Sequence, residues 1–94
     1  MDVVIPEIKY ADVTFNFSGE DALSYSSLPS GLTDVKRIIN IYTYEENLIV
    51  GSPRIYGSNL YIRAYDPGTV VEDFWSGTGL DIRTGSFNAR IYYF

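Results

Sequence analysis

The sequence predicts an all-β domain: an antiparallel β-sandwich of about seven or eight short strands, or a small barrel if the sheet closes on itself. Three observations lead to this fold class. Apolar and polar residues alternate in several short runs, which is the period of a strand with one buried face. Gly, Pro, Ser and Asn separate these runs at intervals of roughly 8 to 12 residues. The chain has 94 residues, so we expect residues 1–94 to form one domain with one core.

The first strand is the clearest one. Val13, Phe15 and Phe17 alternate with polar residues, so we expect them to point into the core. Residues 22–31, which follow Ser18-Gly19-Glu20-Asp21, are polar and rich in serine and contain Pro and Gly near their end. Because such residues interrupt regular structure, we expect a long loop or a single helical turn here.

Residues 34–44 fit two structures. Their second half is rich in Ile, Thr and Tyr, which lose rotamer freedom in a helix and fit a pleated surface, so we predict a strand. Apolar residues also recur here at helical spacing, behind a candidate N-cap at Thr33 or Asp34. Strand and helix therefore both stay open for residues 33–40. The residues at helical spacing are Val35, Ile38, Ile39 and Tyr42.

Two hairpins are expected next. Residues 45–47 form the turn of the first hairpin, and residues 48–50 return as a short buried strand. Residues 51–53, with the sequence Gly-Ser-Pro, are expected to break the chain before the second hairpin. The second hairpin turns at residues 57–59, which are of types that tolerate positive φ.

The C-terminal third continues this pattern. Turns are predicted at residues 66–68 and 84–86, with an apolar run at 70–75 and a short alternating strand at 80–83 between them. The last strand alternates up to the final residue, and we expect it to be paired in a sheet or at a subunit interface, since an unpaired apolar strand invites aggregation. The core-facing residues predicted in the last two long strands are Leu60, Ile62, Ala64, Phe87, Ala89, Ile91 and Tyr93.

Composition excludes most catalytic chemistry. The chain has no histidine and no cysteine, so Ser-His-Asp and Cys-His arrangements, disulfides and thiolate metal sites cannot form. We therefore predict no enzymatic activity, no cofactor and no metal site. A carboxylate pair could act as acid and base, and loop carboxylates could bind calcium, but their spacing matches neither motif. The carboxylates considered are Asp66, Glu72, Asp73 and Asp81.

The net charge of −5 is unevenly placed. Residues 1–34 carry six carboxylates against Lys9 alone, a balance of −5. Phosphate backbones require clustered Lys and Arg, so direct nucleic-acid binding is not expected, whereas an acidic flank could engage a basic protein surface. No run approaches the roughly 18 apolar residues of a transmembrane helix, and no basic region precedes the first apolar run, so we expect no membrane span and no signal peptide.

Tyrosine occurs nine times, and its large ring with one polar tip suits a half-buried sheet or a contact surface. Tyr10 and Tyr93 follow apolar faces and are assigned to the core. Other tyrosines gather with arginines on one side of the strands at 54–65, a combination typical of interfaces. An outer face that only shields the backbone, and a core position for Trp75, are the alternatives. The predicted binding residues are Arg54, Tyr56, Asn59, Tyr61, Arg63, Tyr65 and Trp75.

The order of six segments carries a family resemblance. They are Phe-x-Phe at 15–17, Leu-Pro-Ser-Gly-Leu at 28–32, Val-Lys-Arg-Ile-Ile at 35–39, Gly-Ser-Pro-Arg-Ile-Tyr at 51–56, Tyr-Ile-Arg-Ala-Tyr at 61–65 and Arg-Ile-Tyr-Tyr-Phe at 90–94. In this order they resemble small β-sandwich domains of bacteriophage tail fibres and virion accessory proteins. The resemblance implies a virion module, often trimeric, that binds a host-surface glycan or another virion protein. It assigns no role to any single residue.

We therefore expect a non-enzymatic interaction module of a phage tail or capsid, which mediates assembly or host-surface adhesion. Its expected partner is a virion or host protein or a host-surface glycan, and we expect a homo-oligomer located in the virion or the host cytoplasm. The alternative is a small acidic inhibitor, similar to anti-CRISPR proteins, that occupies the basic nucleic-acid-binding surface of a host defence protein. Binding dominated by such charges would weaken steeply with added salt.

Overall fold

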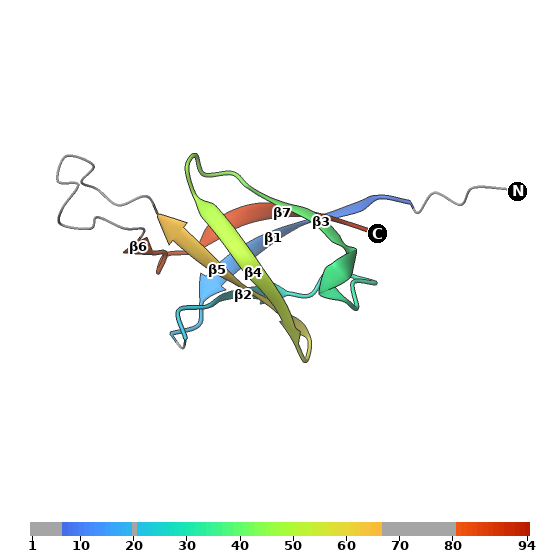
Figure 1. Cartoon of the computed structure of the whole chain (residues 1–94), viewed down its shortest axis with the longest axis horizontal. Coiled ribbons are helices and arrows are strands. Elements are labelled where there is room, and N and C mark those ends of the chain that lie inside the picture. Colours follow the sequence, from blue (N-terminus) through green and yellow to red (C-terminus); the bar gives the residue numbers. More distant parts are fainter. Residues whose placement is uncertain (1–6, 20, 67–80) are drawn as a thin grey trace, which may run out of the picture.

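The computed structural model describes residues 7–19, 21–66 and 81–94. These residues form seven antiparallel strands in one nearly closed, barrel-like sheet (Figure 1), so the all-β prediction is confirmed. The barrel is the closer of the two predicted arrangements, because one continuous sheet curls around the core. The strands are β1 (Lys9–Phe17), β2 (Ser24–Ser27), β3 (Ile38–Thr43), β4 (Ile49–Tyr56), β5 (Asn59–Asp66), β6 (Asp81–Ile82) and β7 (Phe87–Tyr93).

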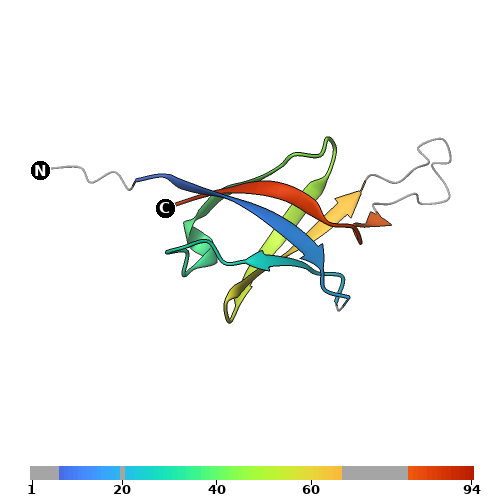
Figure 2. The same ribbon diagram turned by 180° about the vertical axis from the view of Figure 1, so that it is seen from behind.

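The strand order is β3-β7-β1-β2-β5-β4, and β6 pairs separately with β5. Strand β1 belongs to both halves of the sheet: most of its length pairs with β7, and its end, Asn16 and Phe17, pairs with β2. The sheet bends at this change of partner, so that β7 and β1 cross over β4 and β5 (Figures 1 and 2). Strands β3 and β4 are the two ends of the strand order.

The core lies between the inward faces of β5 and β7. These strands are separated by β1 and β2 in the sheet, so their side chains meet only because the sheet curls. The rings of Phe15 and Phe87 stack at the centre, with centroids 5.3 Å apart. The alternation predicted for β1, β5 and β7 is confirmed. The buried apolar residues are Phe15, Leu32, Leu60, Ile62, Ala64, Phe87, Ala89, Ile91 and Tyr93.

The serine-rich segment contains strand β2 (Ser24–Ser27), so the prediction of a loop or a single helical turn for residues 22–31 was wrong there. Strand β2 pairs with β1 on one side and with β5 on the other. Ser24 and Ser26 are buried, at 1% and 3% exposure, where small side chains fit against the core. Composition favours a turn here, but pairing on both sides fixes the strand, because sheet context overrides local preference.

Residues 34–44 combine both predicted structures. Residues Val35–Arg37 form a short 3₁₀ helix, η1, and the strand begins only at Ile38. The Asp34 side chain caps η1 by accepting a hydrogen bond from the Lys36 backbone N–H at 2.9 Å. The strand prediction is therefore correct for β3 and wrong for the first turn, where the carboxylate cap favours a helical start.

The predicted hairpin between residues 38–44 and 48–50 does not form. Strand β3 pairs with β7, whereas β4 pairs with β5. Residues 51–53 do not break the chain either, because they continue β4 through a bulge at which Ser52 has a φ of +55°. Pro53 is compatible with this position because β4 is an end strand. Ile49 is 48% exposed instead of buried.

The second predicted hairpin and the pairing of the last strand are both present in the structure. The second hairpin is confirmed: Tyr56 pairs with Asn59 across a two-residue loop in which Gly57 has a φ of +57°. The last strand is paired on both sides, between β1 and β3, as predicted. The Phe94 N–H extends this contact by donating to the Arg37 carbonyl oxygen at 3.0 Å. The apolar run predicted at 70–75 lies outside the described residues.

Candidate functional site

The predicted Tyr/Arg cluster lies on the outer face of β4 and β5. Arg54 is paired with Tyr61, and Tyr56 is paired with Asn59. The Tyr56 and Tyr61 rings meet edge to face with centroids 5.6 Å apart. Tyr25 of β2 places a third ring 5.8 Å from that of Tyr61. A row of three aromatic rings therefore crosses β4, β5 and β2.

A groove opens beside these rings, and we call it the arginine groove. Its volume is about 320 Å³. Arg54 is exposed, whereas Arg63 is half-buried, and its Nε is shielded from solvent and has no hydrogen-bond acceptor in residues 7–19, 21–66 and 81–94. Within the described part of the chain, neither guanidinium forms an ion pair. The lining residues are Ser18, Asp21, Leu23, Arg54, Tyr56, Tyr61 and Arg63.

The turn between β1 and β2 supplies the acidic rim of this groove. The Ser18 N–H and hydroxyl both donate to the Leu23 carbonyl oxygen, at 2.9 and 2.8 Å. Asp21 and Ala22 have φ values of +52° and +59°, left-handed conformations that reverse the chain within a few residues. This reversal places the exposed Asp21 carboxylate on the same groove as the two arginines.

Four of the seven predicted binding residues line the arginine groove: Arg54, Tyr56, Tyr61 and Arg63. Asn59 lies at the hairpin end of β5, and Tyr65 lies near the other end, paired with Ile49 and Ile82. Neither of them lines the groove. Trp75 lies outside the described residues.

A second surface was missed by sequence reasoning. It is the outer face of β3, β7 and β1, which we call the tyrosine face, and its rings at Tyr10, Tyr42 and Tyr44 are 60%, 54% and 52% exposed. The assignment of Tyr10 to the core was therefore wrong, whereas Tyr93 is buried as predicted. In strand register, the face has three rows: Tyr10, Tyr92 and Asn40; Asp12, Arg90 and Tyr42; Thr14, Asn88 and Tyr44.

The centre of the tyrosine face is an ion pair. The Arg90 guanidinium donates from Nε and Nη2 to the two Asp12 carboxylate oxygens, at 2.9 and 3.1 Å, and lies over the Tyr10 ring, 4.3 Å from its centroid. The Tyr44 hydroxyl donates to the same carboxylate at 2.9 Å. The Arg90 bond and then the Tyr44 bond hold the pKa of Asp12 below its usual value. The bond to Asp12 raises the pKa of Tyr44 and also that of Arg90.

The signal for this face was present in the sequence but depended on register. Each of its three strands places polar or aromatic residues at alternate outward positions, which the pleat dictates. These residues form rows only because β3, β7 and β1 are neighbours in the sheet. The three strands come from segments far apart in the chain. The alternation alone could have selected the residues, but it could not have selected the partners.

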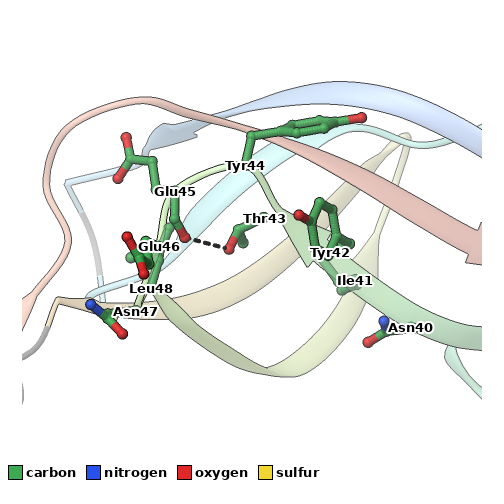
Figure 3. A pocket seen from close by; sticks show the side chains of 9 residues that line it. All are labelled: Asn40, Ile41, Tyr42, Thr43, Tyr44, Glu45, Glu46, Asn47 and Leu48. Carbon is green, nitrogen blue, oxygen red and sulfur yellow. Dashed lines mark hydrogen bonds between the residues drawn. The ribbon is translucent and has the colours of Figure 1, made fainter.

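A second hollow is lined by residues 40–48 and has a volume of about 450 Å³ (Figure 3). Glu45 and Glu46 lie at one end of it and Asn40 at the other, and the Thr43 hydroxyl donates to the Glu45 carbonyl oxygen at 3.2 Å. The Glu45 carboxylate accepts a hydrogen bond from Arg83. Since this carboxylate already has a cationic partner, we do not place a site here.

Carboxylate chemistry has few candidates among the described residues. Asp66 and Asp81 are register partners in β5 and β6, and Asp66 accepts a hydrogen bond from Arg83 Nη1 at 3.0 Å. Glu72 and Asp73 lie outside the described residues. Within the described ranges, no group of three or more acidic side chains is placed to hold a metal ion.

Comparisons with known proteins identify no relative of this chain. A comparison of the chain with protein-family models, with curated proteins and with solved structures found no match. Within the described segments, no helix has the length and apolar character needed to cross a bilayer. Function is therefore inferred from the two outer surfaces alone.

Proposed function

We propose that this protein is a non-enzymatic interaction module of a bacteriophage tail or capsid, which assembles with copies of itself or with another virion protein through its tyrosine face. The observation that carries the proposal is the exposure of three tyrosines, Tyr10, Tyr42 and Tyr44, on one continuous outer face. Tyrosine contributes large contact area at low entropic cost, and it is enriched where proteins bind one another.

The rings on this face are held in place before any partner arrives. Tyr42 and Tyr44 meet edge to face with centroids 5.5 Å apart, and Tyr10 is packed under the Arg90 guanidinium. The Tyr44 hydroxyl is bonded to Asp12. A surface whose side chains are already ordered loses less entropy on binding, which favours a stable contact.

The charges of the tyrosine face also support a protein contact. Asp12 and Arg90 satisfy one another through two hydrogen bonds, so a partner that covers them does not leave a single charge unpaired. Asn40 lies in one outer row, and Thr14 and Asn88 lie in the other, so both outer rows offer groups that can hydrogen-bond to a partner. The tyrosine face thus combines a paired charge at its centre with exposed aromatic rings beside it, and tyrosine and arginine are both enriched in interfaces.

The experiment is sedimentation velocity of the purified chain over a range of concentrations. We expect an oligomer, and we expect the double variant Tyr10→Ser/Tyr42→Ser to sediment as a monomer. The matched control is Tyr56→Ser, which removes another tyrosine of 56% exposure from the opposite half of the sheet and is expected to leave the oligomer intact. A wild-type chain that is monomeric and is also missing from purified virions contradicts the proposal.

The acidic-inhibitor alternative has less support from the described residues. Two of the described carboxylates of the first third are already engaged within the chain: Asp12 pairs with Arg90, and Asp34 caps η1. Asp21 lies beside two arginines in the arginine groove. An inhibitor of a basic surface needs carboxylates that are free and close together, because clustered charge is what attracts such a surface.

A further inference from the structure

The arginine groove holds Arg54 and Arg63, two of the three arginines that form no ion pair among the described residues. The chain has five arginines and a net charge of −5, so carboxylates outnumber them. Arg83 and Arg90 form ion pairs, and Arg37 donates to the Phe94 carbonyl oxygen at 3.3 Å. Although Asp21 lines the same groove, neither Arg54 nor Arg63 forms an ion pair among the described residues, so both guanidinium groups are available to an external anion.

Arg63 is partly buried, so the lack of an ion pair for its guanidinium is unfavourable in the unbound protein. Its Nε is shielded from solvent and has no acceptor among the described residues, so this N–H has lost hydration without gaining a hydrogen bond there. An anion bound to its groove side would offset that loss. Strand β5 fixes the backbone of Arg63, and the half-burial of its side chain restricts the conformations that must be lost on binding.

The bulge in β4 is what brings Arg54 to the same surface. Val50 and Ile55 both pack against the core although they are five positions apart, a spacing that a regular strand would place on opposite faces. The extra residue at Ser52 restores their common orientation. As a consequence, Arg54 and Tyr56 point outward next to Arg63 and Tyr61.

The remaining groups of the groove select among anions. The Asp21 carboxylate on the rim repels a ligand that carries only acceptors, such as sulfate or phosphate, and attracts a ligand that also carries hydroxyl donors. The Tyr56 ring is 56% exposed and can pack against an apolar face. A volume of about 320 Å³ is at the lower end of small-molecule sites, which suits one ring with its substituents.

We propose that the arginine groove binds a sugar acid, a monosaccharide unit with one carboxylate, as found in acidic polysaccharides. Arg54 and Arg63 bind its carboxylate, since guanidinium matches the planar fork of a carboxylate. Asp21 accepts hydrogen bonds from its hydroxyls, and the apolar face of the sugar ring packs on Tyr56. This site is separate from the tyrosine face and does not depend on the oligomeric state.

The first experiment is a titration of the isotope-labelled chain, followed by NMR chemical shifts, with three probes. Sodium glucuronate is expected to bind with a dissociation constant at least about tenfold lower than that of glucose, which lacks the carboxylate, or of sodium sulfate, which lacks hydroxyl donors. The shifts are expected at residues that line the groove. Equal binding of sulfate or of glucose overturns the proposal, and so does no binding of glucuronate.

The second experiment uses variants in the same titration. Arg54→Gln and Arg63→Gln are each expected to weaken glucuronate binding about tenfold or more, whereas Lys36→Gln removes an exposed cation outside the groove and is expected to change it less than twofold. Arg54 is exposed, so its variant keeps the fold even if the Arg63 variant does not. Unchanged affinity in Arg54→Gln, or an equal loss in Lys36→Gln, overturns the proposal.

The last variant tests the selectivity for a sugar acid. Asp21→Asn is expected to weaken glucuronate binding and to strengthen sulfate binding, because it replaces a charged acceptor with two oxygens by a neutral amide with one acceptor oxygen, and the NH₂ of that amide can donate to sulfate. Glu46→Gln removes an exposed carboxylate outside the groove and serves as the matched control, with both affinities expected to change less than twofold. If Asp21→Asn strengthens both probes alike, the groove is a general anion site and the proposal is overturned.

Discussion

The tyrosine face and the arginine groove contain the same types of residue, tyrosine, arginine and aspartate, on opposite halves of one sheet. On the tyrosine face, Arg90 and Asp12 form two hydrogen bonds with each other, and Tyr44 completes the pairing. In the arginine groove, Arg54 and Arg63 form no ion pair within the described residues, although Asp21 lies on the same groove. The two surfaces therefore differ in pairing, not in composition.

That difference decides what each surface can offer to a partner. Where the charges are paired, the aromatic rings are the groups that gain most from being covered, so the tyrosine face suits a protein surface. Where a guanidinium is unpaired and partly buried, an anion provides the missing interaction, so the groove suits a charged ligand. A count of tyrosines and arginines in the sequence cannot distinguish these two cases.

The prediction with the largest expected effect is a loss of stability in core variants, and it tests whether the two surfaces share one core. Ile62 lies on β5 beneath the groove and Ile91 lies on β7 beneath the tyrosine face, and both are fully buried. Ile62→Ala and Ile91→Ala are each expected to lower the free energy of unfolding by about 2–5 kcal/mol, measured by urea denaturation, in one single transition. The milder Ile62→Val is expected to lower it by about 1 kcal/mol. Two separate transitions would show that the halves are independent units.

Much of this shared core could be predicted from the sequence. In β5 and β7 the period of two is regular and the predicted inward residues are the buried ones, whereas in β1 Phe15 is buried, Val13 and Phe17 are half-buried, and Tyr10 is exposed. Strand β2 was missed because Ser24 and Ser26 are polar by composition, and only their pairing with two neighbours shows that they face the core. The false hairpin of β3 with β4 has the same cause, since pairing between distant segments leaves no local signal.

The two surfaces were predictable to different degrees for a related reason. The groove residues of β4 and β5 are joined by a short hairpin, so their proximity follows from the local turn at Gly57. The tyrosine face requires β3 and β1 to meet on either side of β7, which only the fold reveals. Asp21 was also missed, because its place beside Arg63 depends on where the turn after β1 folds.

The second prediction compares a paired arginine with an unpaired one. Arg83 pairs with Glu45 and Asp66 and its side chain is only 19% exposed, so Arg83→Gln is expected to lower the free energy of unfolding by about 2 kcal/mol. Arg63→Gln removes the same charge without breaking an ion pair and is expected to change stability by about 0.5 kcal/mol or less. Urea denaturation measures both. A loss in Arg63→Gln as large as that in Arg83→Gln would mean that Arg63 has a structural partner, and the contrast between the surfaces would fail.

The third prediction separates the surfaces by their response to salt. Raising the NaCl concentration from about 0.05 to 0.5 M is expected to weaken glucuronate binding several-fold, because the screening length falls below the spacing of the groups involved. Self-association through the tyrosine face is expected to change less than about twofold, since its charges are already paired within the chain. Titration and sedimentation at both salt concentrations give the two responses. Self-association that weakens as steeply as glucuronate binding contradicts this separation.

The smallest expected effect concerns the titration of Tyr44. Its pKa is raised by the hydrogen bond to Asp12, so this bond contributes stability below the ordinary tyrosine pKa and loses it as the pH rises through the raised value. The pKa of Asp12 is lowered, chiefly by Arg90, so its contribution is present above the ordinary carboxyl pKa and is lost as the pH falls through the lowered value. Between these two limits the tyrosine face is expected to keep its internal pairing unchanged.

Asp12→Asn tests whether the hydrogen bond to the Asp12 carboxylate is what raises the pKa of Tyr44. In NMR titration of ring-labelled tyrosine, the variant is expected to move the pKa of Tyr44 down toward its ordinary value, since the accepting oxygen is no longer charged. Asp21→Asn removes the same charge from the arginine groove and is expected to leave the Tyr44 titration in place, because exposed charges at that separation are screened. If both variants move Tyr44 equally, the shift reflects the net charge of the chain, and the local pairing that distinguishes the tyrosine face from the groove is not its cause.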